Sequence, residues 1–213
     1  MSSTFSQAGV ARVESVIKLI AQTCVDNEKY FRDLDAVDGE GAFRIPLTRG
    51  SGDVIAEWDE YDRSDLGTFI QKVATTMSGR IGGTSGPIWG TAFLRAAISV
   101  KDKNDISPAD VVAMLRSAVE GIMKRGGASL GDKTLLDALV PLTDAIEADL
   151  DKGLDGKAVA QHAAEVARAA AEETAKLEAH RGRASYTGER SIGSPDPGAI
   201  AMAVLAERIA ETW

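Results

Sequence analysis

Hydrophobic residues recur at every third or fourth position along most of the chain and seldom alternate one by one with polar residues. That spacing is the period of an amphipathic helix, whereas strict alternation is typical of a strand. The first such stretch covers residues 6–24. Across the whole chain the same period predicts roughly eight helices and no strand, an all-α antiparallel bundle with short connections.

Local start and stop signals mark several of these helices. Ser107 and Pro108 predict a helix start, because serine caps the first turn and proline fits within it. That helix is expected to end at Gly126-Gly127, where glycine can adopt a left-handed conformation. Further helices are predicted over residues 133–150, over the alanine-rich stretch 156–180 and over 199–212, the last one after Asp196-Pro197-Gly198.

Composition narrows the class of protein. The 213 residues are 44% hydrophobic and 26% charged, and no Pro-, Ser- or charge-rich linker divides them, so a single domain over residues 1–213 is expected. The net charge of −8 argues against binding to nucleic acid or to a membrane surface. The lone Cys24 falls in the apolar register of the first helix, and the chain start has no signal pattern. A cytoplasmic location is expected.

Glycine gathers at the joints between the predicted helices. Three glycine- and hydroxyl-rich loops, over residues 82–87, 126–131 and 182–198, each precede a helix. Unpaired backbone N–H groups at a helix start attract anions, so these loops favour a phosphate ligand.

The loop "GGASLGDKT" over residues 126–134 nearly matches a phosphate-binding loop. Asp132 separates Gly131 from Lys133, however, and no strand precedes the loop, so that fold is rejected. Two interpretations stay open from the residues alone. In one, Lys133 and Thr134 contact phosphate; in the other, the loop is a helix–helix turn with Asp132 as the N-cap.

Three long motifs together resemble one family. They are "GGTSGPIWGTAFLRAA" (residues 82–97), "GGASLGDKTLLDAL" (126–139) and "GRASYTGERSIGSPDPGA" (182–199). They are similar to the nucleotide-binding L subunit, or carboxy-terminal domain, of dihydroxyacetone kinases. The resemblance implies a barrel of eight antiparallel helices that binds ADP or ATP with magnesium at one end.

The same resemblance implies a phosphotransferase that works with partners. A separate K subunit would hold a small ketose covalently through a histidine, so neither His162 nor His180 of this chain is expected to do so. A phosphotransferase-system protein is a possible phosphoryl donor. Glycerone kinase activity in glycerol metabolism is the implied setting.

The family's nucleotide-binding positions carry over residue by residue. The resemblance places Thr84 and Ser85 on the phosphates. It places Gly126 and Leu135 beside the adenine, and Arg183 matches the arginine of the third loop. It places Asp196, Pro197 and Gly198 near the ribose and base.

The acidic stretch "LDAVDGEGAF" over residues 34–43 departs from the family's metal loop. Three aspartates are usual there; this chain offers Asp35, Glu40 and then Ala42, with an extra acid at Asp38 and Phe43 in place of a phosphate contact. Three interpretations follow: an active kinase whose magnesium site is rebuilt from Asp35, Glu40 and Asp38, a nucleotide-binding regulatory or assembly module with weak catalysis, or carboxylates that cap a helix or face solvent.

Overall fold

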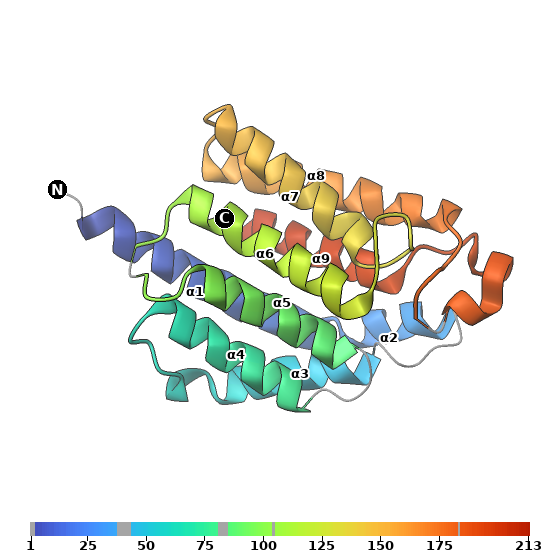
Figure 1. The fold of residues 1–213 in the computed structure, drawn as a ribbon, viewed down its shortest axis with the longest axis horizontal. Coiled ribbons are helices and arrows are strands. Elements are labelled where there is room, and N and C mark those ends of the chain that lie inside the picture. The colour runs from blue at the N-terminus through green and yellow to red at the C-terminus, as the bar shows by residue number, and fades with distance from the viewer. Residues whose placement is uncertain (1–2, 38–43, 81–84, 104, 183) are drawn as a thin grey trace. The chain divides into compact units, whose positions relative to one another are not determined.

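A computed structural model describes residues 3–37, 44–80, 85–103, 105–182 and 184–213 (Figure 1). All regular structure in these ranges is helical, which confirms the predicted all-α class. The α-helices are α1 (Ser3–Asp26), α2 (Glu28–Val37), α3 (Arg44–Ala56), α4 (Leu66–Arg80), α5 (Ser85–Ser99), α6 (Pro108–Gly126), α7 (Leu136–Asp151), α8 (Gly156–Glu173) and α9 (Pro197–Thr212). Short 3₁₀ helices are η1 (Trp58–Glu60), η2 (Thr174–Lys176) and η3 (Ala184–Ser191).

These helices form two compact units. The first contains Met1–Val25 and Pro46–Arg125, and the second contains Asp26–Ile45 and Gly126–Trp213. The expectation of one domain therefore stays a prediction. None of the described helices is both long enough and apolar enough to cross a bilayer.

In the first unit, α4 and α5 pack antiparallel at close range. A Cβ atom on Gly67, near the start of α4, would lie 3.0 Å from the carbonyl oxygen of Ala97 near the end of α5. At the other end, Gly90 of α5 packs against Ser78 of α4 with no room for a Cβ. Phe69 of α4 is fully buried and meets Trp58 edge-on, with ring centroids 5.2 Å apart. Cys24 is buried too, and burial raises the pKa of its thiol to about 12, as expected for a core cysteine.

In the second unit, α8 packs against both α7 and α9. Small residues allow the close approach: Ala167 and Ala171 of α8 and Ala199 and Ala203 of α9 are fully buried. The ends of the helices are tied by polar contacts. His162 Nδ1 of α8 lies 2.5 Å from Asp149 Oδ2 of α7, and Arg168 of α8 makes two bonds of 2.6 and 2.7 Å to Glu207 of α9.

Most predicted boundaries agree with the structure. The helix predicted over 6–24 is α1, slightly longer at both ends, and α6 begins at Pro108 as expected. The cap at Ser107 is a reciprocal box, because the Asp110 N–H donates to its Oγ while the Asp110 carboxylate accepts from the Ser107 N–H. Asp196 likewise caps α9, accepting from the N–H of Ala199 at 2.7 Å.

Two boundaries were predicted wrongly. The alanine-rich helix ends at Glu173 and continues only as the short η2, so His180 lies beyond it. The hydroxyl of Thr174 donates to the carbonyl of Ala171 and accepts the N–H of Asp196, which ends the helix there. The helix predicted from residue 133 begins at Leu136, because Lys133 has a φ of 60° and cannot join a right-handed helix.

Candidate functional site

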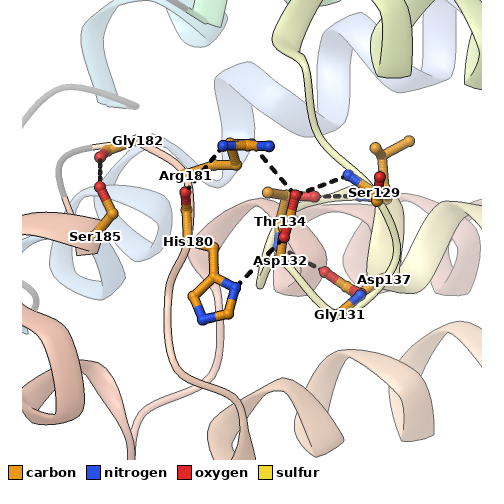
Figure 2. A network of polar contacts seen from close by, with 10 residues as sticks. Ser129, Gly131, Asp132, Thr134, Asp137, His180, Arg181, Gly182 and Ser185 are labelled. Atoms are coloured by element: carbon orange, nitrogen blue, oxygen red, sulfur yellow. Dashed lines mark hydrogen bonds and ion pairs between the residues drawn. The ribbon is translucent and has the colours of Figure 1, made fainter.

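The loop between α6 and α7 is folded around the carboxylate of Asp137. One carboxylate oxygen accepts the N–H of Gly131 at 2.5 Å, and the other accepts the N–H of Thr134 at 2.7 Å (Figure 2). The residue is only 8% exposed, so these two bonds satisfy a largely buried charge. The N–H of Thr134 therefore already has a hydrogen-bond acceptor within the protein and is not an open donor for a phosphate.

Asp132 connects this loop to the segment after η2. Its carboxylate accepts the N–H of Ser129 at 2.9 Å and lies 3.2 Å from Nε of Arg181, as Figure 2 shows. Its backbone carbonyl accepts the N–H of His180 at 3.1 Å. Asp132 is not the N-cap of α7, as one interpretation held: that position is Leu135, which makes no side-chain cap bond.

Lys133 is buried, with 4% of its surface exposed. Its ammonium donates to the carbonyl oxygen of Leu177 at 3.2 Å and to that of Ser191. A lysine held on two protein carbonyls does not point from an open loop toward a phosphate, so the other interpretation of residues 126–134 fails for this side chain as well.

The segment between η2 and α9 is closed by its own contacts. The hydroxyl of Ser191 accepts the N–H of Ala179 at 2.9 Å and donates to the carbonyl of Gly188 at 2.7 Å. The N–H of Gly193 donates to the carbonyl of Ala175 at 2.8 Å. The two ends of the 177–191 loop therefore lie together, and we call them its neck. The ammonium of Lys133 donates to a carbonyl at each end, those of Leu177 and Ser191.

The starts of α7 and α9 meet beside this loop. A Cβ atom on Gly198 would lie 3.2 Å from Cβ of Leu135 and 2.9 Å from Oδ2 of Asp196. Gly198 is buried, whereas Leu135 and Pro197 keep part of their surface exposed. Two loops some sixty residues apart in sequence (135 to 198) thus converge on one place, and an apolar side chain is left accessible at it.

The carboxyl group of Asp196 is in an unusual electrostatic position. Burial above all, together with the nearby Asp137, raises its pKa to about 7, against the opposing effects of the bond from Ala199 and the ammonium of Lys133. The residue as a whole is only partly buried, but this group is desolvated. Asp196 therefore changes its charge near neutral pH.

The structure brings together Leu135, Asp196, Pro197 and Gly198 among the residues that the sequence singles out. Gly126 lies exposed at the end of α6. Ser85 opens α5 and Asp35 lies in α2, but their side chains are outside the described part of the structure. Thr84, Arg183, Asp38 and Glu40, together with Ala42 and Phe43, are outside the described residues altogether.

Metal ligands can be sought only in the part of the chain that the structure describes. No group of three or more His, Cys, Asp or Glu side chains there is placed to hold a metal ion. The acidic stretch that carries the predicted magnesium ligands lies mostly outside that part, so the magnesium site stays a prediction.

Sequence reasoning missed several residues that build this region, above all Asp137, Thr174 and Ser191. One signal was present for Asp137: Thr134-Leu-Leu-Asp137 has the spacing of a capping box, with a hydroxyl residue three positions before an acid. Thr174 and Ser191 act through partners that lie 12 or more residues away, and no local pattern announces such contacts.

Comparison with known proteins shows which family the chain resembles. The sequence profile of the DAK2 domain matches residues 39–211. The chain is 31% identical over 182 residues to the ADP-binding subunit DhaL of the PEP-dependent dihydroxyacetone kinase of Escherichia coli, covering 85% of this chain and 87% of that one. It is 36% identical over 212 residues to the L-erythrulose 1-kinase of Mycolicibacterium smegmatis, covering 99% of this chain but 37% of that protein.

A solved structure shows the same fold. The dihydroxyacetone kinase of C. freundii superposes with a TM-score of 0.76 at 24% identity, covering 100% of this chain and 37% of that chain. A second structure of that kinase, in complex with AMP-PNP and Mg²⁺, superposes equally well, with a TM-score of 0.76.

Proposed function

Since this chain belongs to the DAK2 domain family, we propose that it is the nucleotide-binding subunit of a dihydroxyacetone-type kinase. It binds ADP or ATP with magnesium, and the phosphoryl group passes to a small ketose held on a separate K-type subunit. One observation carries the proposal: Leu135 and Gly198, matched to the base and ribose side of the family's site, lie in contact at the starts of α7 and α9.

Each described residue of that site has a role that its surroundings support. Leu135 and Pro197 offer accessible apolar surface for the base. Gly198 lets the backbone of α9 approach Leu135 without a side chain between them. Asp196 caps α9 and is proposed to lie beside the ribose. Thr84, Ser85 and Arg183 are proposed as the phosphate contacts, since a helix start and an arginine both favour phosphate oxygens.

The magnesium proposal rests on donor chemistry. Asp35, Glu40 and Asp38 supply carboxylate oxygens, which Mg²⁺ prefers, and because this ion keeps several waters, two or three carboxylates are enough. Bound there, the ion would neutralise charge on the phosphates during transfer. The residues of this chain hold and orient the nucleotide; the ketose lies on the partner.

The names of the relatives support a proposal for the phosphoryl donor. Several relatives at 31–35% identity are named as ADP-binding subunits of PEP- or PTS-dependent kinases. We therefore propose that ADP stays on this subunit and is rephosphorylated there by a phosphotransferase-system protein. Exchange of ADP for ATP from solution is the other route.

A second function is favoured by the sequence of the metal loop. Ala42 stands where the family has its third aspartate, and alanine cannot bind a metal. A subunit that binds nucleotide but transfers phosphate poorly would serve as a regulatory or assembly module.

Reconstitution tests the proposal. The chain is mixed with a K-type partner, magnesium and either dihydroxyacetone or a tetrulose. The phosphoryl donor is either ATP or a phosphotransferase-system protein that PEP keeps phosphorylated, and the ketose phosphate is quantified. We expect turnover that requires both chains. Nucleotide binding without turnover would favour the module, and absence of nucleotide binding would contradict both functions.

A further inference from the structure

Lys133 resembles a phosphate-binding lysine in sequence, yet the structure uses it differently. It follows a glycine loop and precedes a helix, as a phosphate-loop lysine does. Its side chain is nevertheless buried and donates to the carbonyls of Leu177 and Ser191. These two carbonyls lie 44 and 58 residues further along the chain, so one side chain bridges the 126–135 loop and the 177–191 loop.

The backbone of Lys133 supports the same conclusion. Its φ of 60° is left-handed, which is uncommon and unfavourable for a residue other than glycine. The surrounding contacts enforce it: Asp137 holds the N–H groups of Gly131 and Thr134 on either side. The residue is therefore held in a costly conformation from which its side chain enters the neck of the 177–191 loop.

The neck that Lys133 enters is continuous with the proposed nucleotide contacts. Ser191 closes the loop through its bonds with Ala179 and Gly188. Lys133 also lies close enough to Asp196 to lower the pKa of that carboxyl group, next to Leu135 and Gly198. A change in the position of the ammonium would therefore affect both the neck of the 177–191 loop and the place where Leu135 meets Gly198.

We propose that Lys133 is a positioning residue of the nucleotide site: it fixes the 177–191 loop against the 126–135 loop and does not itself contact phosphate. This inference rests on the proposed nucleotide-binding function. Loss of the ammonium therefore opens the 177–191 loop and weakens nucleotide binding, as does any other change that opens the loop and leaves Lys133 intact. Loss of a direct phosphate contact would instead weaken binding only in variants of Lys133 and would leave the loop closed.

The test measures ADP binding to Lys133→Met by calorimetry, well below the unfolding temperature, beside the state of the loop. Lys176→Met is the matched control, because Lys176 lies at the same end of the unit but pairs with Glu173 on the surface. We expect Lys133→Met to lose about tenfold in affinity for ADP, the size that one lost charge-assisted hydrogen bond carries. The control is expected to bind ADP like the wild type.

A second readout follows the loop itself. With the neck opened, trypsin should cleave Lys133→Met faster after the exposed Arg181 or Arg190, while Lys176→Met is cleaved there at the wild-type rate. Unchanged ADP affinity in Lys133→Met would overturn the inference, as would a loss of affinity without faster cleavage, which is the result expected of a direct phosphate contact. If the wild type does not bind ADP, the proposed function fails instead.

Ser191→Ala keeps the test decisive should Lys133→Met fail to fold. It removes the hydroxyl that closes the neck from the loop side and leaves Lys133 intact. A loss of ADP affinity with faster cleavage is expected here too, and wild-type affinity for ADP would overturn the inference.

Discussion

Gly198 is the residue at which the starts of α7 and α9 come closest. A methyl group there would meet Oδ2 of Asp196 at 2.9 Å and Cβ of Leu135 at 3.2 Å, and neither neighbour has a long flexible chain that could move aside. We expect Gly198→Ala to cost about 1–3 kcal/mol of stability, as overpacking does, and to reduce ADP affinity. Calorimetry and urea unfolding measure the two effects.

Gly52→Ala is the matched control for this change. Gly52 lies inside α3, and a Cβ there would have no neighbour within 4 Å. In an open helical position alanine is more favourable than glycine by about 0.5–1 kcal/mol, so the control should gain stability and keep ADP affinity. Equal behaviour of the two variants would refute the tight contact at Gly198.

Asp196 makes stability depend on pH near neutrality. Its pKa is raised to about 7 in the folded protein from an ordinary value of 3.8, so the folded state holds its proton over a range where the unfolded chain has released it. The contribution to stability is thus complete below about pH 4 and is lost as the pH rises through about 7. Asp196→Asn, which keeps a good cap, should remove this decline.

The measurement is urea unfolding at several pH values between 4 and 8. Asp196→Asn should gain stability relative to the wild type as the pH rises. Asp155→Asn is the control, because Asp155 caps α8 in the same way, accepting the N–H of Ala158, but is exposed. A difference between Asp196→Asn and the wild type that does not change with pH would contradict the assignment.

At the scale of elements, the α7–α8 pair is joined at one end by a buried carboxylate. Asp149 is 2% exposed and accepts from His162, while Lys152 pairs with its other oxygen at 3.1 Å. These contacts, the one from His162 first, hold its pKa below the ordinary value of 3.8. The stability that Asp149 contributes is therefore present above that value and is lost as the pH falls through its folded pKa.

Replacement of Asp149 tests this junction. Asp149→Asn should lower the urea midpoint at pH 7, and its deficit should shrink as the pH falls below about 4 toward the folded pKa, where the wild-type carboxylate is neutralised too. Asp151 lies two residues after Asp149 and is exposed. Asp151→Asn should therefore keep the wild-type urea midpoint both at pH 7 and below about pH 4. A deficit of the same size at all pH values would mean that the charge of Asp149 is not what joins the helices.

The elements themselves were largely predictable because their boundaries are local. Ser107 and Asp196 cap helices through residues three positions away, and a window of four residues contains the whole interaction. The end of α8 was not predictable in this way. Its alanines continue the helical pattern, but the helix stops where Thr174 bonds to Asp196, which lies 22 residues further on.

The residues of the candidate site also differ in how far the sequence could predict them. Leu135, Asp196 and Gly198 could be chosen from motifs, since they stand in long ordered stretches. The role of Lys133 could not, because the same sequence context suits a phosphate contact and a buried bridge equally well. Only the positions of the Leu177 and Ser191 carbonyls, far along the chain, distinguish the two.

At the scale of the whole molecule, the chain path links the two units. Residues 26–45 belong to the second unit but interrupt the first, so neither unit is one continuous stretch of chain. We expect a single cooperative unfolding transition, as for one domain. Coincident urea curves from circular dichroism and tryptophan fluorescence would agree with this, and two resolved transitions would show that the units unfold separately.

The central claim is that this chain binds an adenine nucleotide. The direct measurement is calorimetric titration of the purified chain, first freed of any bound nucleotide, with ADP, once with magnesium and once with a chelator. The account predicts saturable one-to-one binding that magnesium strengthens. No heat of binding in either titration, for a chain that unfolds cooperatively and is therefore folded, would contradict it.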